Sequence, residues 1–399
     1  MSARICIVGW YGTETIGDRA ILTGLFKVIH QAYGDYEVRL GSLFPFFSRR
    51  TLEEDAPLWE SLGIGPEHLI LFPSKDMRSL DQNIAGADLV CMGGGPLMDL
   101  QELLIIAYAF QKARSCGIKT AILGCGIGPL YEPHFRRRVA QIARYSDLIL
   151  LRDTNSLETL QVLQNEYPDL LPTPPKAFAT LDPAVICSTA FQQKIAGRPR
   201  DNSICINLRT FPSEYLQGAS STVVQQINAF LQKVVSKLCE LYPDRDLHLV
   251  AMHYFTIGND DRRFLSQIKM QLPKNLHVEV AYRPLSLAET MEKFYASSFC
   301  VGMRFHAVLL QTLLNGNNSV IDYTPAGQGK INSFLKDIDS NGYYRQRTIG
   351  LLGGTDESGL SQFFQIPEKP FVVDPSQLTA CEALYLQQIR TTLMGATCA

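Results

Sequence analysis

The chain has 399 residues, of which 46% are hydrophobic and 19% are charged, and its net charge is -2 at pH 7. This length predicts two domains, and this balance is typical of a globular protein, neither disordered nor membrane-embedded. The near-neutral charge argues against a nucleic-acid partner, because duplex binding usually leaves a strongly basic patch. No apolar run approaches the roughly 20 residues that span a bilayer, so we expect peripheral membrane contact at most.

The ten cysteines are scattered, without C-x-x-C pairs or the Cys/His spacing of a zinc site. We therefore expect no bound metal, no disulfide framework and a cytoplasmic location. Cys125, which lies between two glycines, is the one candidate nucleophile among them, but nothing nearby in the sequence supplies its base. The N-terminal apolar run is too short for a secretory signal, and we interpret it as the first strand.

Short β-rich runs alternate with helical patterns along the first half of the chain. Alternation of this kind predicts an α/β fold with a parallel sheet covered on both faces. In the first helix an apolar stripe through Ile21, Leu25, Val28 and Ile29 predicts that this face packs on the sheet. The expected strand and helix pairs are Arg4–Gly9 with Ala20–Tyr33, Asp88–Met92 with Leu100–Ser115, Lys119–Gly124 with Phe135–Tyr145, and Leu148–Leu151 with Ser156–Glu166.

Four prolines within residues 167–176 interrupt the alternation, because proline neither continues a helix nor joins a ladder. We expect an N-terminal domain over 1–185, a C-terminal domain over 186–375, and a C-terminal helix over 376–399 that could pack back toward the N-terminal domain. Both domains are predicted to be doubly wound and Rossmann-like, with a ligand site in the cleft between them. The second series comprises Ser203–Leu208, Val223–Tyr242, Leu247–Met252, a helix from Asp260, His277–Ala281, Leu287–Tyr295 and the strand before Arg304.

Glycine-rich segments follow the predicted strands of the first half. Gly12 and Gly17 lie in the first of them, which ends at Asp18, and Gly94 and Gly95 lie in the second, which ends at Asp99. Glycine allows a ligand to approach the backbone closely. Asp18 suits a helix N-cap as well as a role in binding or deprotonating a hydroxyl. No Gly-Lys-Ser/Thr follows either segment, so a P-loop is not indicated.

Arginine and histidine follow several other strands, namely Arg152, Arg209 and His253. A guanidinium group at the end of a parallel strand suits bidentate contacts to carboxylate or phosphate, although each arginine could instead pair with a nearby aspartate, as Arg152 could with Asp153. The strongest signal is the hexapeptide Gly302-Met303-Arg304-Phe305-His306-Ala307, between a strand and a helix. A helix start already favours anions, so Arg304 and His306 there predict an anionic substrate.

The chain resembles the polysaccharide pyruvyl transferases, ketal-forming relatives of glycosyltransferases with the GT-B fold. The resemblance extends over nearly the whole length and depends on the order and spacing of many short motifs. These are Gly9-Trp10-Tyr11-Gly12 with Gly17-Asp18, Gly93-Gly94-Gly95 with Asp99, Gly126-Ile127-Gly128-Pro129, Leu151-Arg152-Asp153 with Ser156, Asp182-Pro183-Ala184, Asn207-Leu208-Arg209, the hexapeptide, and Tyr323 followed by Lys330.

The resemblance implies that the enolpyruvyl carbons of phosphoenolpyruvate are transferred onto two hydroxyls of one sugar, which forms a cyclic ketal and releases phosphate. It implies no cofactor besides this co-substrate, and a saccharide acceptor from cell-envelope polysaccharide biosynthesis. It leaves open which sugar is used, whether the acceptor is lipid-linked and which oligomer forms.

Fitted to this chemistry, Arg209, Arg304, the helix start at Phe305, Lys330 and Arg152 are expected to bind the donor. His306 is the leading general acid/base, because a group with a pKa near 7 serves proton transfer best. We expect Asp18 and Asp99 to orient or deprotonate the acceptor hydroxyls, beside Gly12, Gly17, Gly94 and Gly95, and we hold His253 in reserve.

The chain departs from the family pattern at the first motif, where Thr15-Ile16 stands in place of the usual Asn and the basic Arg19 follows Asp18. The segment from Tyr323 to Lys330 is also longer than usual, which leaves the role of Lys330 open. Two rival functions remain at this point. They are a nucleotide-sugar glycosyltransferase of the same architecture and a catalytically silent member that binds a saccharide.

Overall fold

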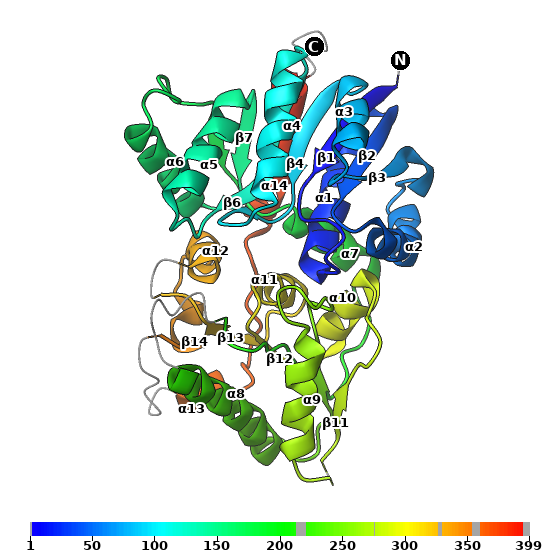
Figure 1. The fold of residues 1–399 in the computed structure, drawn as a ribbon. Helices are drawn as coiled ribbons and strands as arrows, with labels where there is room; N and C mark the ends of the chain where they lie inside the picture. The colour runs from blue at the N-terminus through cyan, green and yellow to red at the C-terminus, as the bar shows by residue number, and fades with distance from the viewer. Residues whose placement is uncertain (1, 213–220, 275, 326–328, 353–359, 394–399) are drawn as a thin grey trace. The chain divides into compact units, whose positions relative to one another are not determined.

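The computed structural model describes residues 2–212, 221–274, 276–325, 329–352 and 360–393. The chain divides into a first unit, Met1–Glu14 with Asp18–Cys187 and Pro375–Ala399, and a second unit, Thr15–Gly17 with Ser188–Asp374. Each unit contains a parallel sheet with helices on both faces (Figure 1), which confirms the predicted α/β class. The chain changes unit two residues beyond the expected boundary, and the Thr15–Gly17 segment, expected in the first domain, is grouped with the second unit.

The sheet of the first unit has the strand order β3-β2-β1-β4-β6-β7-β8, with β5 paired to β6. Its strands are rich in Val, Ile and Leu because helices cover both faces. They are β1 (Ala3–Val8), β2 (Tyr36–Ser42), β3 (Leu69–Pro73), β4 (Leu89–Gly93), β5 (Pro96–Leu97), β6 (Lys119–Ile127), β7 (Leu148–Leu151) and β8 (Ala177–Ala179). The helices are α1 (Ile16–Tyr33), α2 (Pro45–Ser61), α3 (Met77–Ala85), α4 (Leu103–Ser115), α5 (Pro133–Tyr145), α6 (Thr154–Glu166), α7 (Ala184–Ile195) and α14 (Pro375–Gln388).

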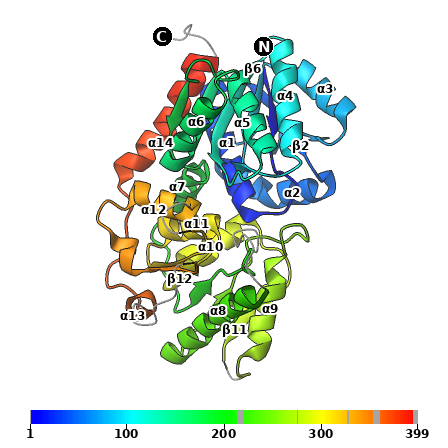
Figure 2. The same ribbon diagram turned by 60° about the vertical axis from the view of Figure 1, so that its left-hand side comes forward.

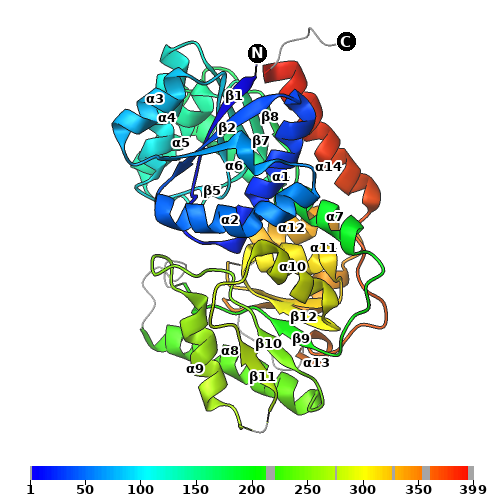
Figure 3. The same ribbon diagram turned by 90° about the vertical axis from the view of Figure 1, so that its right-hand side faces the viewer.

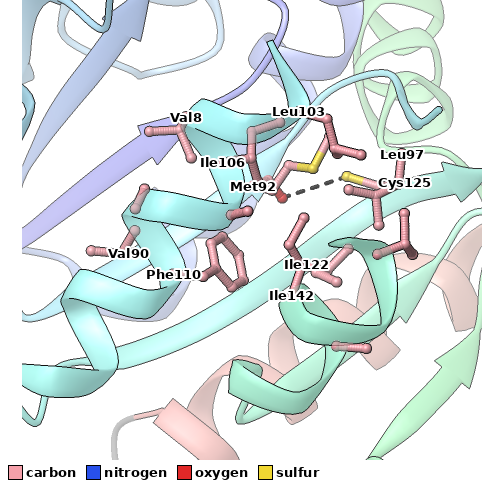
Figure 4. Close-up of a cluster of buried hydrophobic side chains, with 14 of the residues drawn as sticks. Val8, Val90, Met92, Leu97, Leu103, Ile106, Phe110, Ile122, Cys125 and Ile142 are labelled. Atoms are coloured by element: carbon pink, nitrogen blue, oxygen red, sulfur yellow. Dashed lines mark hydrogen bonds between the residues drawn. The ribbon is translucent and has the colours of Figure 1, made fainter. Parts of the chain in front are cut away.

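One face of this sheet packs against α3, α4, α5 and α6 to form a large hydrophobic cluster. Figure 4 shows its centre, where side chains of α4 and α5 meet those of β4 and β6. Cys125 belongs to this cluster, and its thiol donates to the carbonyl of Met92 at 3.6 Å. Burial raises the pKa of Cys125 to about 12, so the candidate nucleophile is a buried core thiol.

Helix α14 packs on the first unit, beside α1 and the loop after β8, although 187 residues separate it from Cys187 along the chain. The Tyr385 hydroxyl donates to the carbonyl of Leu181 at 3.0 Å, and Glu382 pairs with Lys27 of α1. Figures 2 and 3 show α14, in red, alongside this unit.

The sheet of the second unit has the order β11-β10-β9-β12-β13-β14. Helices α8 and α9 cover one face, and α10, α11 and α12 cover the other (Figures 1 and 3). The strands are β9 (Ile204–Ile206), β10 (Leu247–Leu249), β11 (Val278–Val280), β12 (Phe299–Gly302), β13 (Asn318–Asp322) and β14 (Thr348–Gly350). The helices are α8 (Ser221–Leu241), α9 (Asp261–Gln271), α10 (Leu287–Ala296), α11 (Phe305–Leu314), α12 (Lys330–Ile338) and α13 (Leu360–Phe363).

Arg19, which departs from the family pattern, forms an ion pair between α1 and α2. Its Nε and Nη2 atoms donate to the two carboxylate oxygens of Asp55, each at 2.6 Å, and its Nη1 atom lies 3.1 Å from Glu54. The Arg19 and Asp55 side chains are 7% and 2% exposed. The basic residue at this position therefore has a structural role in the first unit.

Replacing Asp55 with Asn is expected to destabilise the first unit by about 3–5 kcal/mol, because a buried guanidinium then loses its buried carboxylate and keeps only the partly exposed Glu54. The double variant Arg19→Met with Asp55→Leu should lose much less, since no charge is left buried. The free energy of unfolding in urea measures both effects. The exposed Arg4–Asp88 pair is the control, and Arg4→Ala should cost about 1 kcal/mol or less. Equal losses in Asp55→Asn and in the double variant would contradict a structural role for the pair.

Candidate functional site

The candidate site of the second unit lies where its sheet changes direction. The chain passes from β9 to β10 on one side and later returns to β12 on the other side, so the ends of β9 and β12 flank a topological switch point, the usual ligand position in such sheets. Asn207 follows β9 and is fully buried. Its amide nitrogen donates to the carbonyl of Val250 after β10 at 2.9 Å, and its oxygen accepts from the backbone of Arg304 after β12 at 3.0 Å.

Arg304 is held by Asp261, the first residue of α9. Its Nε atom lies 2.7 Å from Oδ2 and its Nη2 atom 2.6 Å from Oδ1 of that carboxylate. The Asp261 side chain is 1% exposed, and its Oδ2 atom also accepts from the backbone of Met252 and His253 at 3.0 and 3.2 Å. The Nη1 atom of Arg304 has no hydrogen-bond partner among the described residues. Asp261 therefore holds the Arg304 side chain in one orientation and offsets its charge, and the sequence alone did not indicate this pairing.

Tyr323, the residue after β13, lies near the three cations that were predicted to bind the donor. The Arg209 guanidinium carbon lies 5.8 Å from the centre of the Tyr323 ring, and the Tyr323 side chain is fully buried. Burial by itself raises the pKa of the Tyr323 phenol, but Lys330, Arg209 and Arg304 lower it, and the net shift is downward. The structure thus brings Arg209, Arg304 and Lys330 together around one phenol.

Lys330 is the first residue of α12, and its Nζ atom lies 6.0 Å from the centre of the Phe305 ring. Phe305 is buried and packs edge-on against His306 and Phe334, at centroid distances of 4.9 and 5.9 Å. Only the backbone of Phe305 is therefore suited to the predicted anion contact. Residues 326–328 of the long segment before Lys330 lie outside the described residues.

His306 is the second residue of α11, whose first turn offers backbone N–H groups that have no acceptor within the helix. Its imidazole lies against Gly17. A β-carbon at Gly17 would be 2.0 Å from Nδ1 and 2.4 Å from Cγ of His306, closer than any real contact. Gly17, expected on the acceptor side with the other glycines, belongs instead to the second unit and to the surroundings of His306.

His253, held in reserve as a proton carrier, has both ring nitrogens engaged. Nε2 lies 2.7 Å from the carbonyl of Ile257 and Nδ1 lies 2.8 Å from the hydroxyl of Thr15. Burial, with Arg304 and Arg209 nearby, lowers the pKa of His253 to about 4. This histidine is therefore neutral and committed to its neighbours at physiological pH, which makes it unsuited to the reserve role.

Asp18 and Asp99, the predicted acceptor-side carboxylates, belong to the first unit. Asp18 lies in the first turn of α1, which begins at Ile16, so the alternative role of N-cap is wrong. Asp99 accepts through Oδ2 from the backbone of Tyr131 and Glu132, at 2.7 and 3.1 Å, and so supports the loop that enters α5. One oxygen of Asp99 therefore has a structural task.

In the glycine-rich turns of the first unit, other residues of the protein occupy the space beside each glycine. A β-carbon at Gly95 would lie 2.1 Å from the Trp10 ring, and one at Gly94 would lie 3.0 Å from the Tyr11 hydroxyl. Both glycines have positive φ angles, 92° at Gly94 and 72° at Gly95. At Gly12 the same substitution would meet the Ser42–Phe44 loop. Close packing, rather than a ligand, accounts for glycine at these positions.

Arg152 belongs to the first unit, whereas the residues around Tyr323 belong to the second. Its Nε atom lies 3.2 Å from the carboxylate of Asp153, and both side chains are about 5% exposed. Its guanidinium group also occupies the space beside Gly126. The structure therefore shows the ion pair between Arg152 and Asp153, which was the alternative to donor binding by Arg152.

Within the described residues, no group of three or more His, Cys, Asp and Glu side chains is arranged to hold a metal ion. None of the described helices is both long enough and apolar enough to cross a membrane.

The low pKa of His253 predicts a pH dependence of stability. Between about pH 4 and 6.5 the unfolded chain binds a proton at this residue and the folded chain does not, so stability falls as the pH falls through this window. Between pH 7 and 5 the loss from this residue is about 2 kcal/mol. Urea unfolding at both pH values should show a smaller loss in His253→Asn than in the wild type, and equal losses would refute the assignment.

A family model, "Polysaccharide pyruvyl transferase", matches residues 16–324, and no curated protein matches the chain. Among solved structures, the UDP-GlcNAc 2-epimerase from Neisseria meningitidis bound to UDP-GlcNAc is similar with a TM-score of 0.58 and 12% identity, covering 99% of this chain and 100% of that one. The UDP-GlcNAc 2-epimerase from Methanocaldococcus jannaschii, in complex with UDP-GlcNAc and UDP, has a TM-score of 0.56 and 12% identity, covering 96% and 99%. Identities this low show only that the fold is shared. The shared fold agrees with the two Rossmann-like domains expected from the sequence. The family model spans most of the chain, which therefore belongs to the polysaccharide pyruvyl transferase family.

Proposed function

We propose that this protein transfers the enolpyruvyl group of phosphoenolpyruvate to two hydroxyls of one sugar, as a cyclic ketal, in the biosynthesis of a cell-envelope polysaccharide in the cytoplasm. The observation that carries the proposal is the group of Arg209, Arg304 and Lys330 around Tyr323 at the switch point of the second unit. Membership of the pyruvyl transferase family supports the reaction class.

The charges of the group match a small ligand that carries two acidic functions. Phosphoenolpyruvate has a carboxylate and a phosphate, and arginine binds either of them through parallel N–H donors. Asp261 offsets one of the three positive charges and fixes Nε and Nη2 of Arg304, which directs the Nη1 edge to the ligand. The first turn of α11 adds backbone donors beside it.

The reaction needs two bonds to form at the same carbon of the donor. A proton is first added to the methylene carbon, and one sugar hydroxyl then bonds to the neighbouring carbon. Phosphate leaves from that carbon with its bond electrons, and the second hydroxyl closes the ring. Of the two hydroxyl protons released, one balances the proton added to carbon and the other leaves with phosphate.

In this scheme His306 delivers the proton to the methylene carbon, because an imidazole can be protonated near neutral pH and lies at the helix start beside Arg304. Asp18 is the proposed acceptor-side base, ahead of Asp99, because one oxygen of Asp99 already binds the backbone. Lys330 and Arg209, whose charges also act on Tyr323, are the further proposed donor-binding residues.

Phosphoenolpyruvate should raise the melting temperature of the protein, whereas UDP-GlcNAc should not. A ligand at 100 times its Kd stabilises the folded state by about 2.7 kcal/mol, enough for a clear thermal shift. Arg209→Gln should reduce the phosphoenolpyruvate shift, and Arg263→Gln, an exposed arginine of α9, should leave it unchanged. Stabilisation by UDP-GlcNAc without any by phosphoenolpyruvate would favour a nucleotide-sugar enzyme.

His306→Ala should reduce phosphate release from phosphoenolpyruvate, measured over a panel of hexoside acceptors, by at least 100-fold, which is the usual contribution of a positioned acid. The thermal shift by phosphoenolpyruvate should largely survive, because the arginines remain. His277→Ala removes an imidazole that is 77% exposed in the same unit and should leave the rate unchanged. A His306→Ala rate like that of the wild type would remove His306 from the mechanism.

A further inference from the structure

The segment Thr15–Gly17 is joined to the second unit by its own hydrogen bonds. The backbone of Ile16 donates to the carbonyl of Met252 at 3.0 Å, and Thr15 forms an antiparallel bridge with His253. These contacts group three residues from the N-terminal part of the chain with a unit that otherwise begins at Ser188.

The side chains of Thr15 and His253 add a directed hydrogen bond. Nε2 of His253 must carry a proton to donate to the carbonyl of Ile257, 2.7 Å away. Because the ring is neutral, Nδ1 is then an acceptor, and the Thr15 hydroxyl donates to it over 2.8 Å. His253 is held in turn by Asp261, which accepts from its backbone N–H at 3.2 Å. The position of Thr15 is thus set by the same carboxylate that holds Arg304.

Two residues after Thr15, the backbone of Gly17 lies against the imidazole of His306. A β-carbon there would be 2.0 Å from Nδ1, so the glycine backbone forms a wall of the space in which the imidazole sits. If the segment moves, this contact with the His306 ring changes. The position of the segment therefore limits the positions that the ring can take on the side of Gly17.

We propose that Thr15 and His253 are positioning residues for His306, acting through Gly17. The inference rests on the proposed function for its catalytic consequence, but the geometry is independent of it. A proton donor 1 Å from its productive position loses much of its rate, whereas donor binding by the arginines does not depend on the orientation of this ring. Loss of the Thr15 hydroxyl should therefore act on kcat and not on the KM for phosphoenolpyruvate.

The test compares Thr15→Val, which keeps the shape and removes the hydroxyl, with Thr15→Ser, which keeps the hydroxyl. Thr15→Val should lower kcat about tenfold or more, with the KM for phosphoenolpyruvate within about twofold, and Thr15→Ser should stay close to the wild type in both. Thr15→Val kinetics equal to those of Thr15→Ser, or a change confined to KM, would overturn the proposal.

A second readout does not depend on turnover. In protein labelled at histidine, NMR resolves the imidazole of His306, assigned by its absence in His306→Asn, and that of the exposed His277. Thr15→Val should shift the His306 resonances and the pH at which they titrate. Thr15→Ser should leave the His306 resonances unchanged, and neither variant should change the His277 signals. An unchanged His306 signal in Thr15→Val overturns the inference. A shifted signal in a protein that never consumes phosphoenolpyruvate supports the inference and refutes the proposed function.

Should Thr15→Val fail to fold, Gly17→Ala directly tests the contact between the Gly17 backbone and the His306 ring. Gly17 lies in the first turn of α1, where alanine is favoured over glycine in a helix by about 1 kcal/mol, so the helix itself is not weakened. The new β-carbon displaces the ring, so kcat should fall tenfold or more and the His306 resonances should shift. Wild-type kcat and an unchanged His306 signal in Gly17→Ala would contradict the proposed contact.

Discussion

The second unit depends on one buried carboxylate, that of Asp261. A charge removed from water must be matched by opposite charge and by hydrogen bonds, and Asp261 receives both, from the Arg304 guanidinium and from two backbone N–H groups. These partners come from the loop after β10 and from the second residue after β12. The carboxylate therefore ties together strand ends that lie on either side of the switch point, and it gives Arg304 a single orientation.

A second constraint is the repulsion among Arg209, Arg304 and Lys330. Cations that act on one buried phenol also repel one another, and this costs stability unless other groups offset it. Asp261 neutralises one guanidinium, the face of the Tyr323 ring attracts another, and the carboxyl group of Asp322 interacts with Lys330. Such an arrangement gains most from an anionic ligand, which replaces the repulsion with attraction. Arg304 and Lys330 lie at helix starts, and Arg209 lies in the segment that follows β9.

The sequence predicted the alternating strands and helices well where apolar runs are uninterrupted, as in β4, β6 and β12. It did not place β2, α2, β3 or α3 within residues 34–87, because Glu37 and Arg39 divide the apolar residues of β2 and α2 is mostly polar. Arg209 and Arg304 were recognised from their places after strands, and Lys330 from the family resemblance. Their partners were not, because Asp261 lies 43 residues before Arg304, and only the strand order shows that the two segments meet.

The groups that lie against the glycines could not be predicted from the sequence. A glycine-rich turn after a strand indicates that something approaches the backbone, but the sequence does not show whether that is a ligand or the protein itself. At Gly94 and Gly95 it is the rings of Tyr11 and Trp10, and at Gly126 it is the guanidinium of Arg152. At Gly17 it is the imidazole of His306, a group that can carry a proton. Glycine at the first three positions admits a side chain that has only a packing role, whereas glycine at position 17 admits the imidazole that is the proton donor of the proposed mechanism.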